Sequence, residues 1–170
     1  PGPQPTLPAR KERWIPTVTV APAVGWPEGT APTAAPGLDV TAFARGLDHP
    51  RWLYVLPNGD VLVAETNAPP KPAQKQGLRT WFMQRAMKKA GAAAPSANRI
   101  TLLRDADGDG VAELRTAFLT GLFSPFGMAL VDGRLYIANA DAIVSVPYRE
   151  GQTVSDATPV KLVDLPGGPL

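Results

Sequence analysis

The chain has 170 residues, of which 44% are hydrophobic, 19% are charged and none is cysteine, and its formal net charge is +2. This length suits one domain with a sizeable core. The weak net charge argues against a nucleic-acid-binding protein, and the lack of cysteine excludes disulfides and thiolate-bound metals. The chain begins with Pro1 rather than Met, so we expect a processed or trimmed polypeptide whose targeting segment has been removed.

Proline dominates the N-terminal segment, residues 1–37, which holds nine of the 20 prolines. Because proline lacks an N–H group and fixes φ, this segment cannot build a hydrogen-bonded ladder of its own. We therefore expect an extended N-terminal arm over residues 1–37 and a folded body over residues 38–170.

Short strands with alternating or wholly apolar patterns fill the folded body. The expected strands are 38–45, 51–57, 60–65, 98–104, 111–119, 126–131, 134–139, 142–147 and 158–164. Asn58-Gly59 separates two of them and is a strong signal for a tight hairpin. The sequence therefore predicts an all-β fold.

These strands repeat along the chain. The stretch G-L-D-H-P-R-W-L at 46–53 recurs as G-L-F-S-P-F-G-M at 121–128, and the strands that follow each copy have the same order. Without the inserted segment 66–97, the period is roughly 45 residues, and four short strands in such a period are typical of a β-propeller blade. The alternative is a chance likeness between hairpins of an ordinary sandwich.

In the propeller interpretation, about two blades are present. Blade one spans about 51–119, blade two spans about 126–164, and residues 165–170 begin blade three. Residues 38–45 would be an outer strand that closes the ring. Two blades alone leave an open edge, so we expect the N-terminal portion of a protein roughly two to three times longer.

The meander order predicts which connections share an end of the sheets. The turns at 46–50 and 121–125 fall at the same end as segment 66–97. The stretch R-D-A-D-G-D-G-V-A-E-L-R at 104–115 falls at the opposite end.

This acidic stretch has the spacing of a calcium loop. The candidate oxygen ligands are the side chains of Asp105, Asp107, Asp109 and Glu113 and the carbonyl of Val111. Thr116 stands where an EF-hand has its last glutamate, and strands flank the loop, so the loop is not an EF-hand. The alternative is a polar turn without a metal.

Segment 66–97 is longer than a blade needs. Within it, residues 77–90 combine an apolar stripe with several basic residues at helical spacing. We expect a helical insertion that covers the turn-bearing end or makes a peripheral contact with a membrane or a partner. The alternative is a solvated helix packed on its own propeller.

Residues that end strands or form turns at the same end are candidates for the rim of a pocket. They are His49, Glu65, Asn67, Ser124, Phe126 and Asn139. His49 is the only histidine in the chain, and its alternative role is that of a structural turn residue.

Several long motifs occur in order: G-L-D-H-P-R-W-L-Y-V-L-P-N-G-D-V-L-V-A-E-T-N, P-S-A-N-R-I-T-L-L-R-D-A-D-G-D-G-V-A-E, G-L-F-S-P-F-G-M-A-L and L-V-D-L-P-G-G-P-L. Through them, the chain from Val24 to Leu170 resembles sorbosone dehydrogenases, relatives of the soluble glucose dehydrogenases that use pyrroloquinoline quinone (PQQ). The resemblance implies a six-bladed propeller in the periplasm or outside the cell. It also implies oxidation of a sugar or sugar aldehyde by hydride transfer to the quinone.

The resemblance places no catalytic residue inside this chain. The family's catalytic histidine follows the L-P-G-G-P-L turn, so it is expected just after Leu170, and the side chains that bind PQQ are expected later still. By itself this fragment is therefore expected to be inactive. The alternative function is a non-enzymatic propeller that binds carbohydrate or a protein partner.

Overall fold

A computed structural model of the chain describes residues 21–22, 24–27, 29–67, 81, 85, 87 and 96–166. Its strands are β1 (Pro50–Val55), β2 (Val61–Glu65), β3 (Arg99–Arg104), β4 (Leu114–Leu119), β5 (Met128–Val131), β6 (Arg134–Ala138), β7 (Ala142–Pro147) and β8 (Val160–Asp164). The predicted all-β fold is confirmed for the part of the chain that the structure describes. Among these residues, no helix has the length and apolar character needed to cross a membrane.

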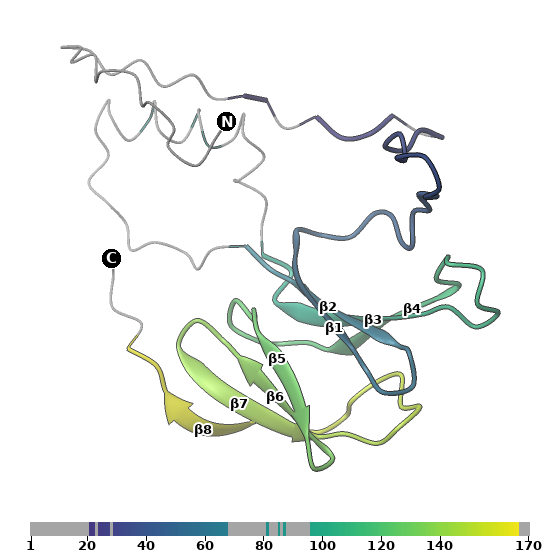
Figure 1. The fold of residues 1–170 in the computed structure, drawn as a ribbon. Coiled ribbons are helices and arrows are strands. Elements are labelled where there is room, and N and C mark those ends of the chain that lie inside the picture. Colours follow the sequence, from purple (N-terminus) through teal and green to yellow (C-terminus); the bar gives the residue numbers. More distant parts are fainter. Residues whose placement is uncertain are drawn as a thin grey trace, which may run out of the picture.

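The strands form two four-stranded antiparallel sheets, in the orders β1-β2-β3-β4 and β5-β6-β7-β8 (Figure 1). Each sheet is a meander, in which every strand pairs with the next one along the chain. Asp132 and Gly133 join β5 to β6 with φ angles of 48° and 71°. Two consecutive positive φ angles define the tight turn whose twist matches that of the flanking strands, which explains the Asp-Gly pair.

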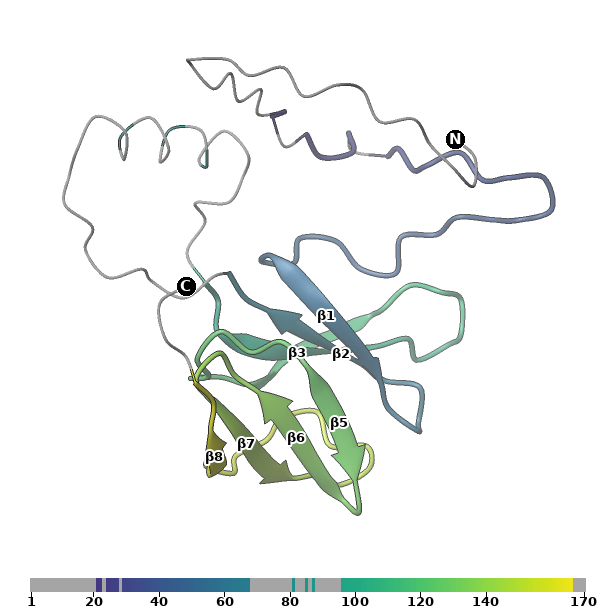
Figure 2. The ribbon, with the colours of Figure 1, turned by 60° about the vertical axis from the view of Figure 1, so that its left-hand side comes forward.

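The two sheets lie next to each other (Figure 2), and buried side chains from both of them form one hydrophobic core. Its most buried side chains are Leu62, Ile100, Leu102, Phe118, Leu135, Ile137 and Val146. Burying a side chain of this kind stabilises the fold by about 1.5–3 kcal/mol. Alternation along β2, β3 and β6 sends Leu62, Ile100, Leu102, Leu135 and Ile137 to the shared core, and Phe118 and Val146 join them from β4 and β7.

The two sheets meet with their first strands side by side. The Tyr54 hydroxyl of β1 accepts a hydrogen bond of 3.0 Å from the backbone N–H of Leu130 in β5. The rings of Trp52 and Phe126 are 5.2 Å apart at the same place. At the other side, Phe118 of β4 faces Tyr148, with ring centroids 6.3 Å apart.

The two sheets also share an irregularity in their fourth strands. In β4, Phe118 has no pairing partner in β3, because Ile100 pairs with Leu119 and Thr101 pairs with Ala117. In β8, Leu162 is skipped in the same way, because Ile143 pairs with Val163 and Val144 with Lys161. A β-bulge at corresponding positions of both sheets supports a true structural repeat.

The turns that precede the two sheets adopt the same backbone. Gly46 and Gly121 have φ angles of 68° and 72°, and His49 and Ser124 have φ angles of 56° and 44°. Positive φ is uncommon for a residue with a side chain, so finding it twice at one motif position indicates a common turn. Both turns share the sequence pattern G-L-x-x-P, at residues 46–50 and 121–125. The predicted repeat is therefore also a repeat in backbone geometry.

The strand expected at 38–45 is wrong for this structure, because this stretch has no strand assignment. Its backbone carbonyl at Phe43 accepts a hydrogen bond of 2.8 Å from Ala112, which lies outside any strand. A strand needs a neighbouring strand to pair with, and none of the described residues provides one here. Alternation alone could not reveal this missing neighbour.

Two other predictions fall mostly outside the described residues. In the arm 1–37, the described residues contain no strand or helix. In the insertion 66–97, Trp81, Arg85 and Met87 have helical backbone, and the rest of the predicted helix 77–90 lies outside the described residues.

The ends of this insertion are already joined, so we predict that removing residues 68–95 leaves the sheets intact. The backbone N–H of Asn67 donates to the Ser96 hydroxyl at 2.9 Å, and the Thr66 hydroxyl lies 3.1 Å from the same atom. A two-glycine linker in place of residues 68–95 should raise the free energy of unfolding by about 2 kcal/mol, because the cost of closing a loop falls by about 0.6 kcal/mol for each halving of its length. Urea denaturation measures this change, and loss of a cooperative transition would contradict it.

Candidate functional site

The acidic loop begins at one end of β3, directly after Arg104, and returns to β4 at Leu114. Asp105 holds the bend together, because its carboxylate accepts hydrogen bonds from the backbone of Gly108 at 2.7 Å and of Gly110 at 2.9 Å. Gly108 and Gly110 have φ angles of 79° and 87°, which favour glycine at these two positions. The sequence therefore folds the loop around the first aspartate.

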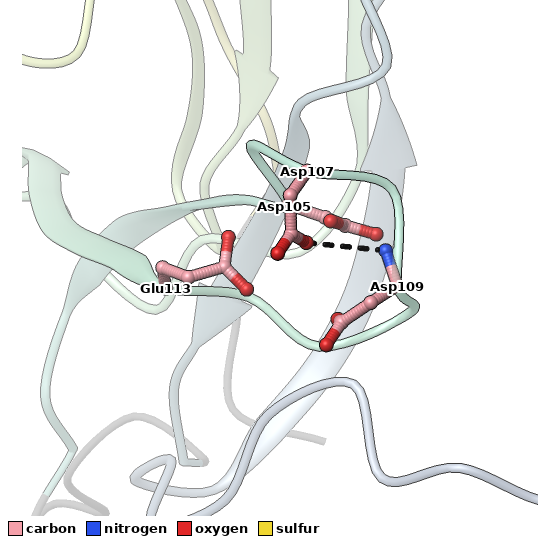
Figure 3. A group of neighbouring side chains, drawn as sticks. All are labelled: Asp105, Asp107, Asp109 and Glu113. Atoms are coloured by element: carbon pink, nitrogen blue, oxygen red, sulfur yellow. Dashed lines mark hydrogen bonds between the residues drawn. The ribbon is translucent and has the colours of Figure 1, made fainter.

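Four carboxylates gather inside this bend (Figure 3). One oxygen from each of Asp105, Asp107, Asp109 and Glu113 can be chosen so that all lie within 4.8 Å of one another. Two oxygens on opposite sides of one Ca²⁺ ion are about 4.6–5.2 Å apart, because each lies about 2.3–2.6 Å from the ion. The spacing therefore fits a single ion of this size, and the oxygen-only donors suit calcium.

Asp105 stays charged in the absence of an ion. The backbone hydrogen bond from Gly110, with a further one from Gly108, holds the pKa of the Asp105 carboxyl below its usual range. Protonation of Asp105 therefore does not relieve the repulsion among the carboxylates near neutral pH. The N–H of Val111 donates to the Asp109 carboxylate at 2.8 Å. That the carbonyl of Val111 binds the metal stays a prediction.

At the opposite end of the sheets, a polar network joins the turn at 121–125 to the ends of the insertion. The Asn98 carboxamide oxygen accepts hydrogen bonds from the Ser96 hydroxyl at 2.6 Å and from the backbone of Ser124 at 3.0 Å. The Ser124 hydroxyl in turn donates to the carbonyl of Asn67 at 3.0 Å. Two of the predicted rim residues, Asn67 and Ser124, are thus brought into direct contact.

Glu65 lies at the same end but is fully buried. Its carboxylate accepts hydrogen bonds from Arg99, from the Thr101 hydroxyl and from the backbone N–H of Asp48. Burial alone would raise the pKa of the Glu65 carboxyl, but these hydrogen bonds outweigh it and hold the pKa below its usual range. Glu65 therefore fastens the first G-L-x-x-P turn to β2 and β3.

The other predicted rim residues divide by exposure. Phe126 is 43% exposed, whereas Asn139 is buried and its carboxamide oxygen has no hydrogen-bond partner among the described residues. The carbonyl of His49 accepts a hydrogen bond of 3.1 Å from Thr66, which places this turn beside the end of β2. All six residues lie at the end of the sheets opposite the acidic loop.

Two exposed residues beside Phe126 were not predicted from the sequence. Trp52 is 45% exposed and packs against Phe126, and the Arg51 guanidinium lies 5.8 Å from the centre of the same ring. The signal that could have found them is the repeat, because Arg51 and Phe126 follow the prolines of the two G-L-x-x-P turns. The cluster presents aromatic faces and one cation to solvent.

Comparison with protein families gave one match, to a domain of unknown function, DUF7133, over residues 57–162. This match covers more than half of the chain. The chain belongs to the DUF7133 family. Searches of curated proteins and of solved structures gave no match. The matched part of the DUF7133 chain includes the acidic loop and most of both sheets, but it excludes His49 and the first G-L-x-x-P turn.

Proposed function

We propose that the two sheets of this DUF7133 protein are the first two blades of a β-propeller. The observation that carries the proposal is a contact that occurs twice. The carbonyl of Phe118 in β4 accepts a hydrogen bond of 2.7 Å from the N–H of Ser155, in the β7–β8 connection of the next sheet. The carbonyl of Phe43 likewise accepts a hydrogen bond of 2.8 Å from the N–H of Ala112, in the β3–β4 connection.

The neighbouring residues repeat as well. The Thr116 hydroxyl donates to the carbonyl of Thr153, two residues before Ser155. The Thr41 methyl group lies 3.9 Å from the point where a Cβ on Gly110 would be, two residues before Ala112. Residues 41–43 and 116–118 both read T-A-F. Residues 41–43 thus sit against the first sheet as β4 sits against the second, which is expected of the outer strand of a preceding blade in a closed ring.

The proposed activity of the complete protein is oxidation of a sugar or sugar aldehyde by PQQ. Its support is the ordered set of motifs shared with sorbosone dehydrogenases, together with the repeated sheets that such a propeller requires. The resemblance places the quinone-binding residues beyond Leu170, and no quinone site is assigned to the described residues. When bound, PQQ would supply the hydride acceptor, and the networks around Glu65 and Asn98 would hold the turns that border its face of the ring.

The test uses the complete polypeptide encoded by the reading frame that contains these 170 residues. After loading with PQQ and Ca²⁺, it should reduce an artificial electron-accepting dye when aldoses or sugar aldehydes are added. The 170-residue chain, treated in the same way, should give no reduction. Dye reduction by neither protein with any sugar or aldehyde would contradict the proposed activity.

A second candidate function is a propeller that binds carbohydrate or a protein partner without catalysis. The exposed cluster of Trp52, Phe126 and Arg51 favours it, because such side chains are enriched where proteins bind other molecules. This candidate would be supported if the protein bound a carbohydrate or a protein without reducing dye. That binding should be lost on substitution Trp52→Ala but kept on Trp26→Ala. Trp26 is a suitable control because it is also exposed, at 64%.

We further propose that the acidic loop binds one Ca²⁺ ion as a structural site. Calcium should then raise the melting temperature of the protein, because an ion that binds only the folded state stabilises it. The variant Asp107→Ala should lose this response while folding normally without calcium, since Asp107 is exposed and its carboxylate accepts a long hydrogen bond, 3.3 Å, from the backbone N–H of Asp109.

Thermal unfolding with added CaCl₂ or EGTA measures the calcium effect. Asp156→Ala, which removes an exposed carboxylate outside the loop, is the matched control and should keep the full response. An equal calcium response in wild type and Asp107→Ala would show that the loop is an ordinary polar turn.

A further inference from the structure

The bulge in each fourth strand is a contact point for the neighbouring sheet. Phe118, the bulged residue of β4, is completely buried, and the β7–β8 connection covers it. Tyr148 lies against its ring, and Ser155 binds its carbonyl. A bulge turns its extra residue out of the regular pairing, which frees it to contact a neighbour.

The corresponding residue of β8 is Leu162, and it is 50% exposed. Val160 and Val163 on either side are 53% and 50% exposed, and every residue of the strand is exposed. The same backbone irregularity is therefore buried in one sheet and open to solvent in the other. Three exposed aliphatic residues on one edge strand form a surface that proteins usually cover.

We propose that β8 is the docking site for a third four-stranded sheet of the same repeat, carried by the same polypeptide. The inference rests on the propeller proposed above. The connection between the third and fourth strands of that sheet would lie against Val160 and Leu162, as residues 153–155 lie against β4. One of its backbone N–H groups would donate to the carbonyl of Leu162.

The sequence of β8 specifies the character of this partner. Val160 of β8 stands at the position that Thr116 has in β4. Valine has no hydroxyl to donate to a facing carbonyl, as Thr116 does to Thr153, so the contact on β8 would be more apolar. Lys161 and Asp164 form an ion pair of 2.8 Å on this exposed strand. Charged side chains on an edge strand oppose pairing between copies of the protein, which favours a sheet of the same chain over a second molecule.

The test compares two variants of the complete polypeptide encoded by the reading frame that contains residues 1–170. Leu162→Asp should lower its melting temperature by at least about 5 °C, because it places a charge in a buried contact. Val131→Asp is the matched control, because Val131 is similarly exposed at 50% and lies on β5, at the other edge of the sheet from β8, and it should leave the temperature unchanged within about 1 °C. In the 170-residue chain, Leu162→Asp should have no effect.

Other outcomes would overturn the inference. A reading frame that ends at Leu170, or a complete polypeptide that tolerates Leu162→Asp, leaves no third sheet on β8. If the 170-residue chain associates in sedimentation velocity and Leu162→Asp makes it monomeric, the occupant is a second copy. The readout does not depend on catalysis, so a protein that responds to Leu162→Asp but reduces no dye keeps the docking site and loses only the proposed activity.

Discussion

Replacing Arg104 by methionine should lower the free energy of unfolding by about 3 kcal/mol, because it leaves a buried carboxylate without its partner. Both guanidinium nitrogens that face Asp60 donate to it at 2.7 Å, and Asp60 is only 2% exposed. Arg104 also donates to the carbonyl of Gly151, in the β7–β8 connection, at 3.2 Å. The variant therefore weakens both the first hairpin and the contact between sheets.

Urea denaturation at neutral pH measures the loss. Lys161→Met is the control, because it breaks an ion pair whose partners are 59% and 77% exposed and should cost less than about 0.5 kcal/mol. Adding Asp60→Asn to Arg104→Met should restore part of the stability, since the buried charge is then gone. Equal effects of Arg104→Met and Lys161→Met would contradict the account.

In Arg104→Met, the effect of pH on the contribution of Asp60 to stability should be opposite to that in the wild type. In the wild type, the hydrogen bonds from Arg104 hold the pKa of Asp60 below its usual value of 3.8. Their stabilising effect is therefore complete above that value and is lost as the pH falls through the lower pKa of the folded state. In Arg104→Met, burial is no longer opposed by Arg104, so part of the stability lost at neutral pH should return on acidification.

Replacing Glu65 by glutamine should lower the free energy of unfolding by about 1.5–3 kcal/mol, the usual value of hydrogen bonds to a charged group. Glutamine keeps the shape of the side chain but removes the charge that faces Arg99. It also removes the charge that faces Arg115, whose guanidinium lies 3.6 Å from the Glu65 carboxylate. The first G-L-x-x-P turn should loosen, because Asp48 is held by Glu65 through its backbone and by Arg99 through its carboxylate at 2.8 Å.

Denaturation at pH 7 and at pH 3 checks this second prediction. The pKa of Glu65 is lowered in the folded protein, so its stabilising effect is present above the usual value of 4.5 and is lost on acidification. The difference between wild type and Glu65→Gln should therefore shrink at pH 3. Asp48→Asn is the control, since the Asp48 side chain is 64% exposed and its loss should cost under about 1 kcal/mol. A constant difference at both pH values would be the wrong result for a paired carboxylate.

The features that were predictable from the sequence are those written in local patterns. Asn58-Gly59, the repeated G-L-x-x-P turn and the spacing of Asp105, Asp107 and Asp109 each depend on a few neighbouring residues, and the hairpin, the repeat and the carboxylate cluster all formed. In these cases the local backbone preference and the fold agree.

The features that could not be predicted depend on pairing between distant residues. Glu65 was expected at a rim, but pairing between β2 and β3 places it opposite Arg99, after a long insertion in the sequence. The stretch 38–45 has the alternation of a strand, yet its conformation depends on whether a neighbouring strand is present. The bulges at Phe118 and Leu162 are likewise set by register, which alternation does not encode.

A crystal structure of the complete polypeptide tests the central claim most directly, namely that these sheets are consecutive blades of one ring. The account predicts that residues 41–45 pair as the outer strand of the last sheet, that Phe43 stays bound to Ala112, and that further sheets follow β8 around a common axis. A sandwich in which the two sheets close a core by themselves, with residues 41–45 unpaired, would contradict it.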